Sequence, residues 1–178
     1  MRIISGKYRG RRINPPQGFK ARPTTDYARE SLFNILANRI DFEDTEVLDL
    51  FSGTGSISYE FASRGAITVH LVEKDIRNIS FIRKTINEMK IENVKALHVD
   101  VKAYLKTCRY RYDIVFADPP YDLPWLNEIP DLLLQTGILK ETGVFILEHP
   151  KGTSFTSHRN FTEHRDYGSV NFSFFSPI

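Results

Sequence analysis

The residues from Asp118 to Tyr121 form the stretch of this chain that is best suited to chemistry on a small planar ligand. The stretch reads Asp-Pro-Pro-Tyr and follows the apolar run 112–117, which is typical of a buried strand. The Asp118 carboxylate can accept a hydrogen bond from an amine, the fixed φ of proline holds the Pro119 carbonyl at one angle, and the Tyr121 ring can stack on a base. Open α/β sheets bind ligands at the carboxyl ends of their strands. These residues are therefore suited to bind an exocyclic amino group of a nucleobase. Because Asp-Pro and Pro-Pro also mark ordinary turns, a strand followed by a turn is the alternative.

A glycine-rich turn lies upstream of this stretch. The apolar run 46–51 is followed by Ser-Gly-Thr-Gly-Ser at residues 52–56 and then by apolar residues at helical spacing. The glycines allow a close backbone approach to a ligand, and the helix that follows offers free N–H groups. The dinucleotide-binding fingerprint requires a third glycine where this chain has Ser58, and Asp49 in the strand would repel a pyrophosphate. An acid at that point favours a ligand with a positive charge.

Four successive predicted strands finish in an acidic residue. These strands cover residues 46–51, 69–75, 95–100 and 112–117, and the acids are Asp49, Glu73, Asp100 and Asp118. Glu73 follows Gly53 by twenty residues, the spacing at which a carboxylate reaches a ribose diol. A single acid after a strand is usually a solvated cap for the next helix. Four acids along one sheet edge predict an acidic pocket for a ligand with a positive centre, a ribose and a purine.

The elements that must position these residues alternate between strands and helices. Helices are expected from about residues 24–26 to Leu36, over 75–90 and over 125–135, and a central strand over 143–149. Residues 161–167 and 170–175 predict a hairpin around Gly168-Ser169. This order predicts an α/β fold with a mostly parallel sheet and an antiparallel C-terminal edge.

The composition excludes several classes of protein. A chain of 178 residues that is 41% hydrophobic predicts one globular domain with a single core. The sequence has no run of eighteen apolar residues and no signal-peptide pattern, so membrane and secretory classes are disfavoured and we expect a cytoplasmic protein. Its one cysteine, Cys108, excludes an internal disulfide and a cysteine-based zinc site.

The N-terminal segment is strongly basic. Residues 1–25 contain seven of the 24 basic residues and none of the 22 acidic residues, which leaves the remainder with an acidic excess of five. Residues 8–11 have the composition of a hairpin turn, and three isoleucines, Ile3, Ile4 and Ile13, would anchor a hairpin. A solvated charged tail is the alternative. We expect a basic arm over residues 1–23 and the main domain over 24–178, with the arm facing an RNA backbone through Lys7, Arg9, Arg11, Arg12 and Arg22.

These motifs together resemble those of a known family. Residues 49–55, Glu73 and residues 118–121 are similar to the S-adenosylmethionine-binding and target-amine motifs of class I methyltransferases. The N-terminal segments 3–13, 22–26 and 29–34 resemble the RsmD family more specifically. RsmD enzymes are bacterial and methylate N2 of guanine 966 in 16S ribosomal RNA.

The resemblance implies a fold, a cofactor and a set of site residues. The fold would be Rossmann-like with seven strands, and S-adenosyl-L-methionine would be the cofactor, without a metal. The cofactor-binding residues would be Thr24, Asp49, Phe51, Gly53, Thr54, Gly55, Glu73 and Asp100. Asp118 and Pro119 would accept the N–H bonds of the target amine, and Tyr121 would stack on the base. The partner would be 16S rRNA in the small ribosomal subunit or in an assembly intermediate, and the protein would be a monomer.

Other functions are open from the sequence. A DNA adenine-N6 methyltransferase shares the Asp-Pro-Pro-Tyr motif but generally carries an extra target-recognition region. A protein-glutamine methyltransferase usually has asparagine in place of Asp118. An RNA-binding assembly factor without catalysis would need neither Asp118 nor the glycine turn, and a dehydrogenase is disfavoured by Asp49 and Ser58. His149 could be a base, although a structural histidine is the simpler interpretation.

Overall fold

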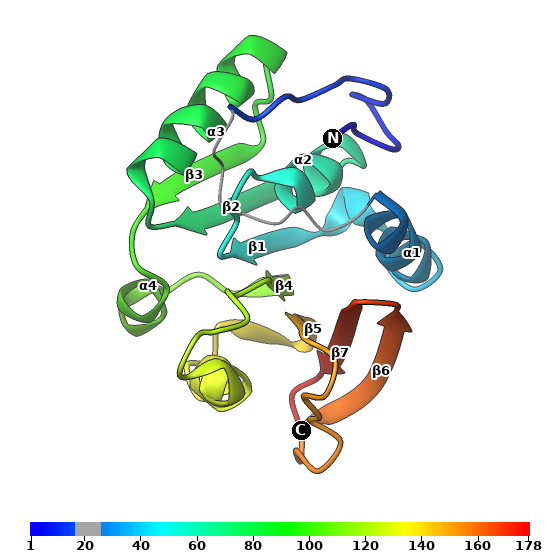
Figure 1. The fold of residues 1–178 in the computed structure, drawn as a ribbon, viewed down its shortest axis with the longest axis vertical. Coiled ribbons are helices and arrows are strands. Elements are labelled where there is room, and N and C mark those ends of the chain that lie inside the picture. Colours follow the sequence, from blue (N-terminus) through cyan, green and yellow to red (C-terminus); the bar gives the residue numbers. More distant parts are fainter. Residues whose placement is uncertain (17–25) are drawn as a thin grey trace.

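The computed structural model describes residues 1–16 and 26–178, and its centre is a seven-stranded sheet within these ranges (Figure 1). The strands are β1 (Glu46–Leu50), β2 (Thr68–Glu73), β3 (Val94–His98), β4 (Tyr112–Ala117), β5 (Leu139–His149), β6 (Phe161–Tyr167) and β7 (Val170–Phe175). The helices are α1 (Asp26–Ala37), α2 (Ser56–Ser63), α3 (Ile76–Met89), α4 (Val101–Thr107) and α5 (Ile129–Leu134), with short 3₁₀ turns at Phe42–Asp44 and Leu126–Glu128.

The strand order is β3-β2-β1-β4-β5-β7-β6. The first five of these strands are mutually parallel, whereas β7 pairs antiparallel with both β5 and β6. Leu50 pairs with both Val72 and Ala117, and Ala117 pairs with Leu147, so the carboxyl ends of β1, β2, β4 and β5 meet at one edge. The predicted mostly parallel sheet with an antiparallel hairpin is confirmed.

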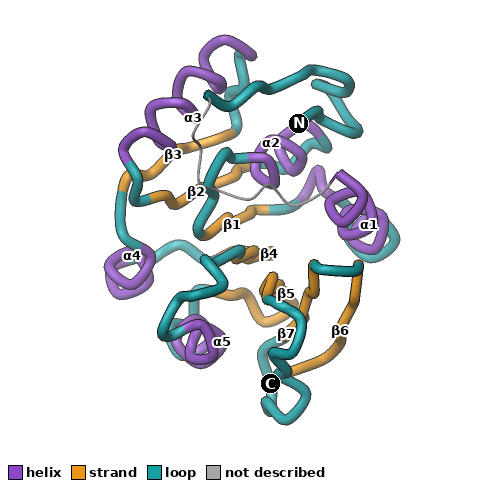
Figure 2. The backbone as a smooth tube through the Cα atoms, viewed as in Figure 1, coloured by secondary structure: helices purple, strands orange, loops and turns teal. Residues whose placement is uncertain are grey.

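Helices cover both faces of this sheet (Figure 2). One core packs α1, α2 and α3 on residues such as Val47 and Ile114, and the other packs α4 and α5 on residues such as Leu48 and Val115. Neighbouring residues of a strand point to opposite faces, so the buried strands read as nearly continuous apolar runs. This alternation directs the side chain of Asp49 toward the face that α2 covers, where Ser58 contacts it.

The structure corrects three predicted boundaries. The third strand ends at His98, and Asp100 lies two residues beyond it as the N-cap of α4, a helix that the sequence analysis did not predict. The helix expected over 125–135 begins as a separate 3₁₀ turn, because Pro130 has no N–H with which to continue it. The central strand begins at Leu139, four residues earlier than expected.

The N-terminal segment folds as a hairpin against α2. Ile3 N–H donates to the Arg11 carbonyl at 3.0 Å, and Arg11 N–H closes the turn on the Tyr8 carbonyl at 3.2 Å. The N–H groups of Ile4 and Ser5 donate to the buried carboxylate of Glu60 at 2.9 and 3.1 Å. The hairpin is therefore tied to the main core by hydrogen bonds as well as by its buried isoleucines. The expected domain boundary at residues 23 and 24 lies outside the described residues.

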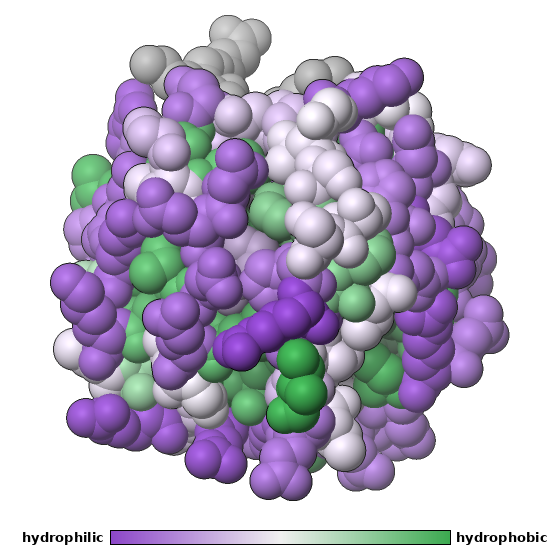
Figure 3. Space-filling model, turned by 90° about the horizontal axis from the view of Figure 1, so that it is seen from below, coloured by the Kyte–Doolittle hydropathy of each residue, from purple (hydrophilic) through white to green (hydrophobic). Residues whose placement is uncertain are grey.

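Strand β6 is one of the two edge strands of the sheet, and β3 is the other. Glu163 of β6 pairs with Arg165 and, at 2.7 Å, with Arg39 of the segment after α1. Such charged side chains on an edge strand discourage pairing with another sheet. Most of the face seen in Figure 3 is hydrophilic, with hydrophobic residues scattered in small groups. Within the described ranges, no helix has both the length and the apolar character needed to cross a membrane.

Candidate active site

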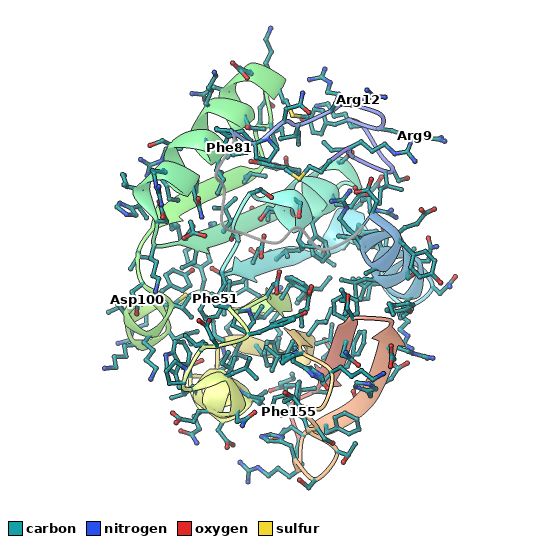
Figure 4. The ribbon with its side chains drawn as sticks, in the orientation of Figure 1. Arg9, Arg12, Phe51, Phe81, Asp100 and Phe155 are labelled. Carbon is teal, nitrogen blue, oxygen red and sulfur yellow. The ribbon has the colours of Figure 1, made fainter. Side chains whose placement is uncertain are left out.

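A pocket of about 630 Å³ lies at the carboxyl edge of the sheet, within the size range of small-molecule sites. It is lined by residues from the glycine turn, from the ends of β2 and β5, and from the segment after β4. All four predicted acids line it, namely Asp49, Glu73, Asp100 and Asp118. Phe51 and Asp100 are labelled at this edge in Figure 4. The register of the parallel strands thus gathers residues that are far apart in the sequence.

The turn after β1 has backbone angles that glycine adopts readily. Gly53 has φ +54° and Gly55 has φ +80°, and a Cβ on Gly55 would lie 2.7 Å from the ring of Tyr59. Phe51 also has a positive φ, +60°, which is uncommon for a residue with a side chain and is typical of functional sites. Its ring packs on Trp125, with the two centroids 5.8 Å apart. The turn therefore presents an aromatic wall to the pocket, while the Gly53 N–H donates to Glu73 and the Gly55 N–H donates to the Ser52 carbonyl.

Asp49 is the most deeply buried of the four acids, with 1% of its surface exposed. Ser58 of α2 donates a hydrogen bond to its Oδ2 at 2.5 Å. Burial raises the pKa of Asp49 to about 7; the hydrogen bonds from Ser58 and Ser52 oppose this shift, and the nearby Glu73 adds to it. A carboxylate in this position would gain from a cationic ligand. Ser58, which stands where the fingerprint has its third glycine, therefore orients Asp49, a role that the sequence analysis did not foresee.

Glu73 and Asp100 contact the backbone as well as the pocket. Glu73 accepts the N–H of Gly53 at 2.9 Å on one carboxylate oxygen and the N–H of Asp75 at 2.7 Å on the other. It thus braces the glycine turn, and each oxygen keeps a second lone pair for a ligand. Asp100 is exposed and accepts the N–H of Ala103 at 3.2 Å as the cap of α4.

The Asp-Pro-Pro-Tyr stretch lies at the sheet edge beside these acids. Asp118 N–H donates to the Leu50 carbonyl at 3.3 Å, which ties the stretch to β1. Burial raises the pKa of Asp118 well above its ordinary value, and the charges of Glu148 and Asp49 raise it further. The Tyr121 ring is partly exposed, and its hydroxyl donates to Oε1 of Glu148 at 3.2 Å.

Glu148 of β5 is a pocket residue that the sequence analysis missed. It is 4% exposed and lines the pocket. Its signal in the sequence was an acid near the end of a predicted central strand, next to the more conspicuous His149. The ring of His149 lies within 2.9 Å of the Ser173 hydroxyl and 3.1 Å of the Pro150 carbonyl, and burial lowers its pKa. His149 is therefore a structural histidine.

The basic residues of the hairpin lie apart from the pocket lining. Lys7, Arg9, Arg11 and Arg12 are exposed, and Figure 4 shows Arg9 pointing away from the hairpin. Arg11 also donates to the Met89 carbonyl at 3.1 Å, so part of its donor capacity serves the fold. The predicted sites Arg22 and Thr24 lie outside the described residues.

A second cavity of about 670 Å³ lies between the hairpin and α3. Arg12 lines it from the hairpin, and Arg77 and Lys84 line it from α3. The hairpin and α3 thus form one surface with more basic than acidic side chains, called the basic surface below, in which Lys84 pairs with Glu88 at 3.7 Å and Arg77 with Asp75 at 3.1 Å. Across residues 1–16 and 26–178, no cluster of three or more His, Cys, Asp or Glu side chains could hold a metal ion.

The strand order, the glycine turn after β1 and the acid-lined pocket define the fold of class I methyltransferases. A family model described as "Conserved hypothetical protein 95" matches residues 1–176. Ribosomal RNA small subunit methyltransferase D of Escherichia coli is 33% identical over 167 residues, which cover 93% of this chain and 83% of that protein. The chain therefore belongs to the RsmD family.

Solved structures agree with this assignment. The Escherichia coli chain described as "Putative methyltransferase yhhF" superposes with a TM-score of 0.85 at 29% identity, over 100% of this chain and 99% of that one. SMU.776, solved as a complex with SAH (S-adenosylhomocysteine), superposes with a TM-score of 0.66 at 21% identity, over 83% of this chain and 49% of that one. This second likeness concerns the fold alone.

Proposed function

We propose that this protein transfers the methyl group of S-adenosyl-L-methionine to the exocyclic N2 amine of a guanine in 16S ribosomal RNA. The observation that carries the proposal is the position of Asp118, which borders the same pocket as the glycine turn and the buried Asp49. Guanine 966 as the target is what the resemblance to the RsmD family implies.

The pocket fits the proposed cofactor in charge and in volume. Asp49 is a buried carboxylate whose raised pKa would return toward its ordinary value beside an ammonium group, so we assign it to the methionine amine. Glu73 would take the ribose diol, and Asp100 the adenine amine at the exposed end of the pocket. Phe51 and the turn from Gly53 to Gly55 would line the cofactor. When bound, the cofactor supplies a methyl group already activated by its sulfonium.

The residues after β4 would orient the target amine. Asp118 and the Pro119 carbonyl would each accept one N–H of the amine, so that its lone pair faces the methyl group. Such positioning supplies on the order of 7–11 kcal/mol toward a displacement reaction. Asp118 would lie beside the reacting nitrogen in this arrangement, so its carboxylate is also placed to accept the proton that the amine loses. Tyr121 would stack on the base after its extrusion from the RNA, which costs a few kcal/mol.

The hairpin and α3 would bind the RNA backbone. Lys7, Arg9 and Arg12 are exposed on the hairpin, and Lys84 and Arg77 continue the basic surface on α3. Phosphate contacts of this kind give affinity and orientation without reading the sequence. We propose a cytoplasmic monomer that acts on 16S rRNA in the small subunit or in an assembly intermediate.

Transfer of labelled methyl groups tests this function. The protein is given undermethylated small subunits, naked 16S rRNA and duplex DNA in parallel, and the label is mapped after nuclease digestion. We expect N2-methylguanosine in the ribosomal substrate, and a loss of at least about 100-fold in rate for Asp118→Asn with cofactor binding retained. Asp44→Asn, at an exposed acid away from the pocket, is the matched control and should be fully active.

Two other results would contradict the proposal. Label on adenine in DNA would mean that the stretch from Asp118 to Tyr121 binds the amine of adenine and not that of guanine. Cofactor binding without transfer to any of the three substrates would indicate an RNA-binding assembly factor.

A further inference from the structure

Glu148 lies beside Asp118 at the carboxyl edge of the sheet. In the parallel pairing of β4 and β5, Ala117 stands opposite Leu147, so Asp118 and Glu148 are the next residues along two adjacent strands. Ala117 and Leu147 both pack in the core with α4 and α5. The side chains that follow them therefore turn to the opposite face, into the pocket that both residues line.

The side chain of Glu148 is held in this position. Its surface is 96% buried, and the Tyr121 hydroxyl donates to its Oε1 at 3.2 Å. Tyr121 belongs to the same short stretch as Asp118, so this hydrogen bond links the two sides of the pocket. The two acids also interact electrostatically, since the charge of Glu148 raises the pKa of Asp118.

Two adjacent acceptors match one edge of guanine. Guanine carries a donor at N1–H directly beside the N2 amine, whereas adenine carries a lone pair at N1 beside its N6 amine. A single carboxylate that accepts a hydrogen bond from an exocyclic amine can bind either guanine or adenine. A second carboxylate beside it would accept N1–H from guanine but would face the N1 lone pair of adenine, leaving buried polar groups unpaired.

We propose that Glu148 selects guanine by accepting a hydrogen bond from N1–H while Asp118 accepts one from the N2 amine. This inference rests on the proposed function and assigns the choice of base to a residue outside the Asp-Pro-Pro-Tyr stretch. Tyr121 then has two tasks, since it orients Glu148 in addition to stacking on the base.

The test compares guanine with 2-aminopurine at the target position of ligated 16S rRNA. 2-Aminopurine keeps the amine in the same place but has a lone pair at N1 instead of N1–H and no oxygen at C6, so the change of the ratio in a Glu148 variant, and not the wild-type ratio alone, reports on N1–H. For the wild-type protein we expect kcat/KM to be on the order of 30-fold or more higher for guanine than for 2-aminopurine. In Glu148→Gln, whose amide donates as well as accepts, we expect this ratio to fall at least tenfold, mainly through loss of activity on guanine.

Controls separate selection from folding and from the proposed function. Glu141→Gln, an exposed acid on the same strand, should keep the wild-type ratio. Tyr121→Phe leaves the ring but removes the hydrogen bond to Glu148, and should lower the ratio less than Glu148→Gln does. An equal loss on both bases in Glu148→Gln, or a wild-type ratio near one, would overturn the inference while leaving the methyltransferase proposal intact. Methylation of neither base by the wild-type protein would overturn both.

Discussion

At the scale of single residues, the buried carboxylate of Asp49, which we assign to cofactor binding, lowers the free energy of unfolding. Its carboxylate is buried under α2 with Ser58 as a hydrogen-bond donor, and its pKa is about 7 instead of the ordinary 3.8. The folded state thus binds the Asp49 proton more tightly than the unfolded chain does. This group therefore lowers the free energy of unfolding as the pH rises from about 4 to about 7, and the cost is complete above pH 7.

Replacing Asp49 with asparagine should remove this pH-dependent cost. We expect Asp49→Asn to gain about 2–3 kcal/mol more in free energy of unfolding, relative to wild type, at pH 8 than at pH 5. The same variant should lose cofactor binding, because asparagine has no charge for an ammonium group. Urea denaturation at the two pH values measures the first effect and calorimetry the second. An identical stability difference at pH 5 and pH 8 would show that Asp49 does not titrate in this range.

At the scale of elements, the N-terminal hairpin depends on a close contact with α2. Lys7 N–H donates to the Ser63 carbonyl at 2.7 Å, and Tyr8 N–H donates to the Ser63 hydroxyl at 2.9 Å. A Cβ on Gly6 would lie 1.7 Å from that same carbonyl oxygen. Gly10 has nearly the same φ, +81°, but nothing lies within 4 Å of its Cβ position.

This pair of glycines separates backbone strain from the contact. Gly10→Ala should cost about 1–2 kcal/mol, the penalty of a side chain in the left-handed region. Gly6→Ala should cost about 3 kcal/mol or more, because the hairpin must also move away from α2 and lose hydrogen bonds there. Denaturant unfolding gives both values, and limited proteolysis within residues 1–13 should be faster only for Gly6→Ala. Equal effects of the two substitutions would mean that the hairpin does not need this contact.

At the scale of the whole molecule, opposite charges are separated in space. Acids line the pocket at the carboxyl edge of the sheet, whereas Arg12 on the hairpin and Lys84 on α3 belong to the basic surface, and Arg9 is exposed on the same hairpin. If this surface binds RNA phosphates, removing its charges should weaken binding in a salt-dependent way. If only the net charge of the protein mattered for RNA binding, removing two arginines would have the same effect wherever they lie.

Two matched double substitutions distinguish phosphate binding by the hairpin from an effect of net charge. Arg9→Gln with Arg12→Gln should lower the magnitude of the slope of log Kd against log salt by about 1.5 for 16S rRNA. Arg109→Gln with Arg111→Gln removes the same charge from exposed residues just before β4, and should leave the slope nearly unchanged. Binding titrations at several salt concentrations give the slopes. Equal slopes for the two double variants would rule out the hairpin as the phosphate-binding surface.

The sequence by itself determined the features that depend on local pattern. Runs of apolar residues marked the strands, the residues around Gly168 marked the C-terminal hairpin, and an acid near each strand end marked the edge where the pocket lies. Local pattern is informative here because a strand's side-chain alternation, a positive φ at glycine and a tight turn each arise from a few consecutive residues.

The tertiary structure alone decided which of these residues meet. Glu148 reaches Tyr121 across 27 positions of the sequence, Glu73 reaches the N–H of Gly53 across 20, and the hairpin reaches Glu60 across more than 50. Only the register between neighbouring strands, and the packing of helices on the sheet, sets which partners lie within hydrogen-bonding distance. The roles of Ser58 and Glu148 also depend on folding, because neither residue belongs to a sequence motif. Ser58 contacts the carboxylate of Asp49, and Glu148 contacts the hydroxyl of Tyr121.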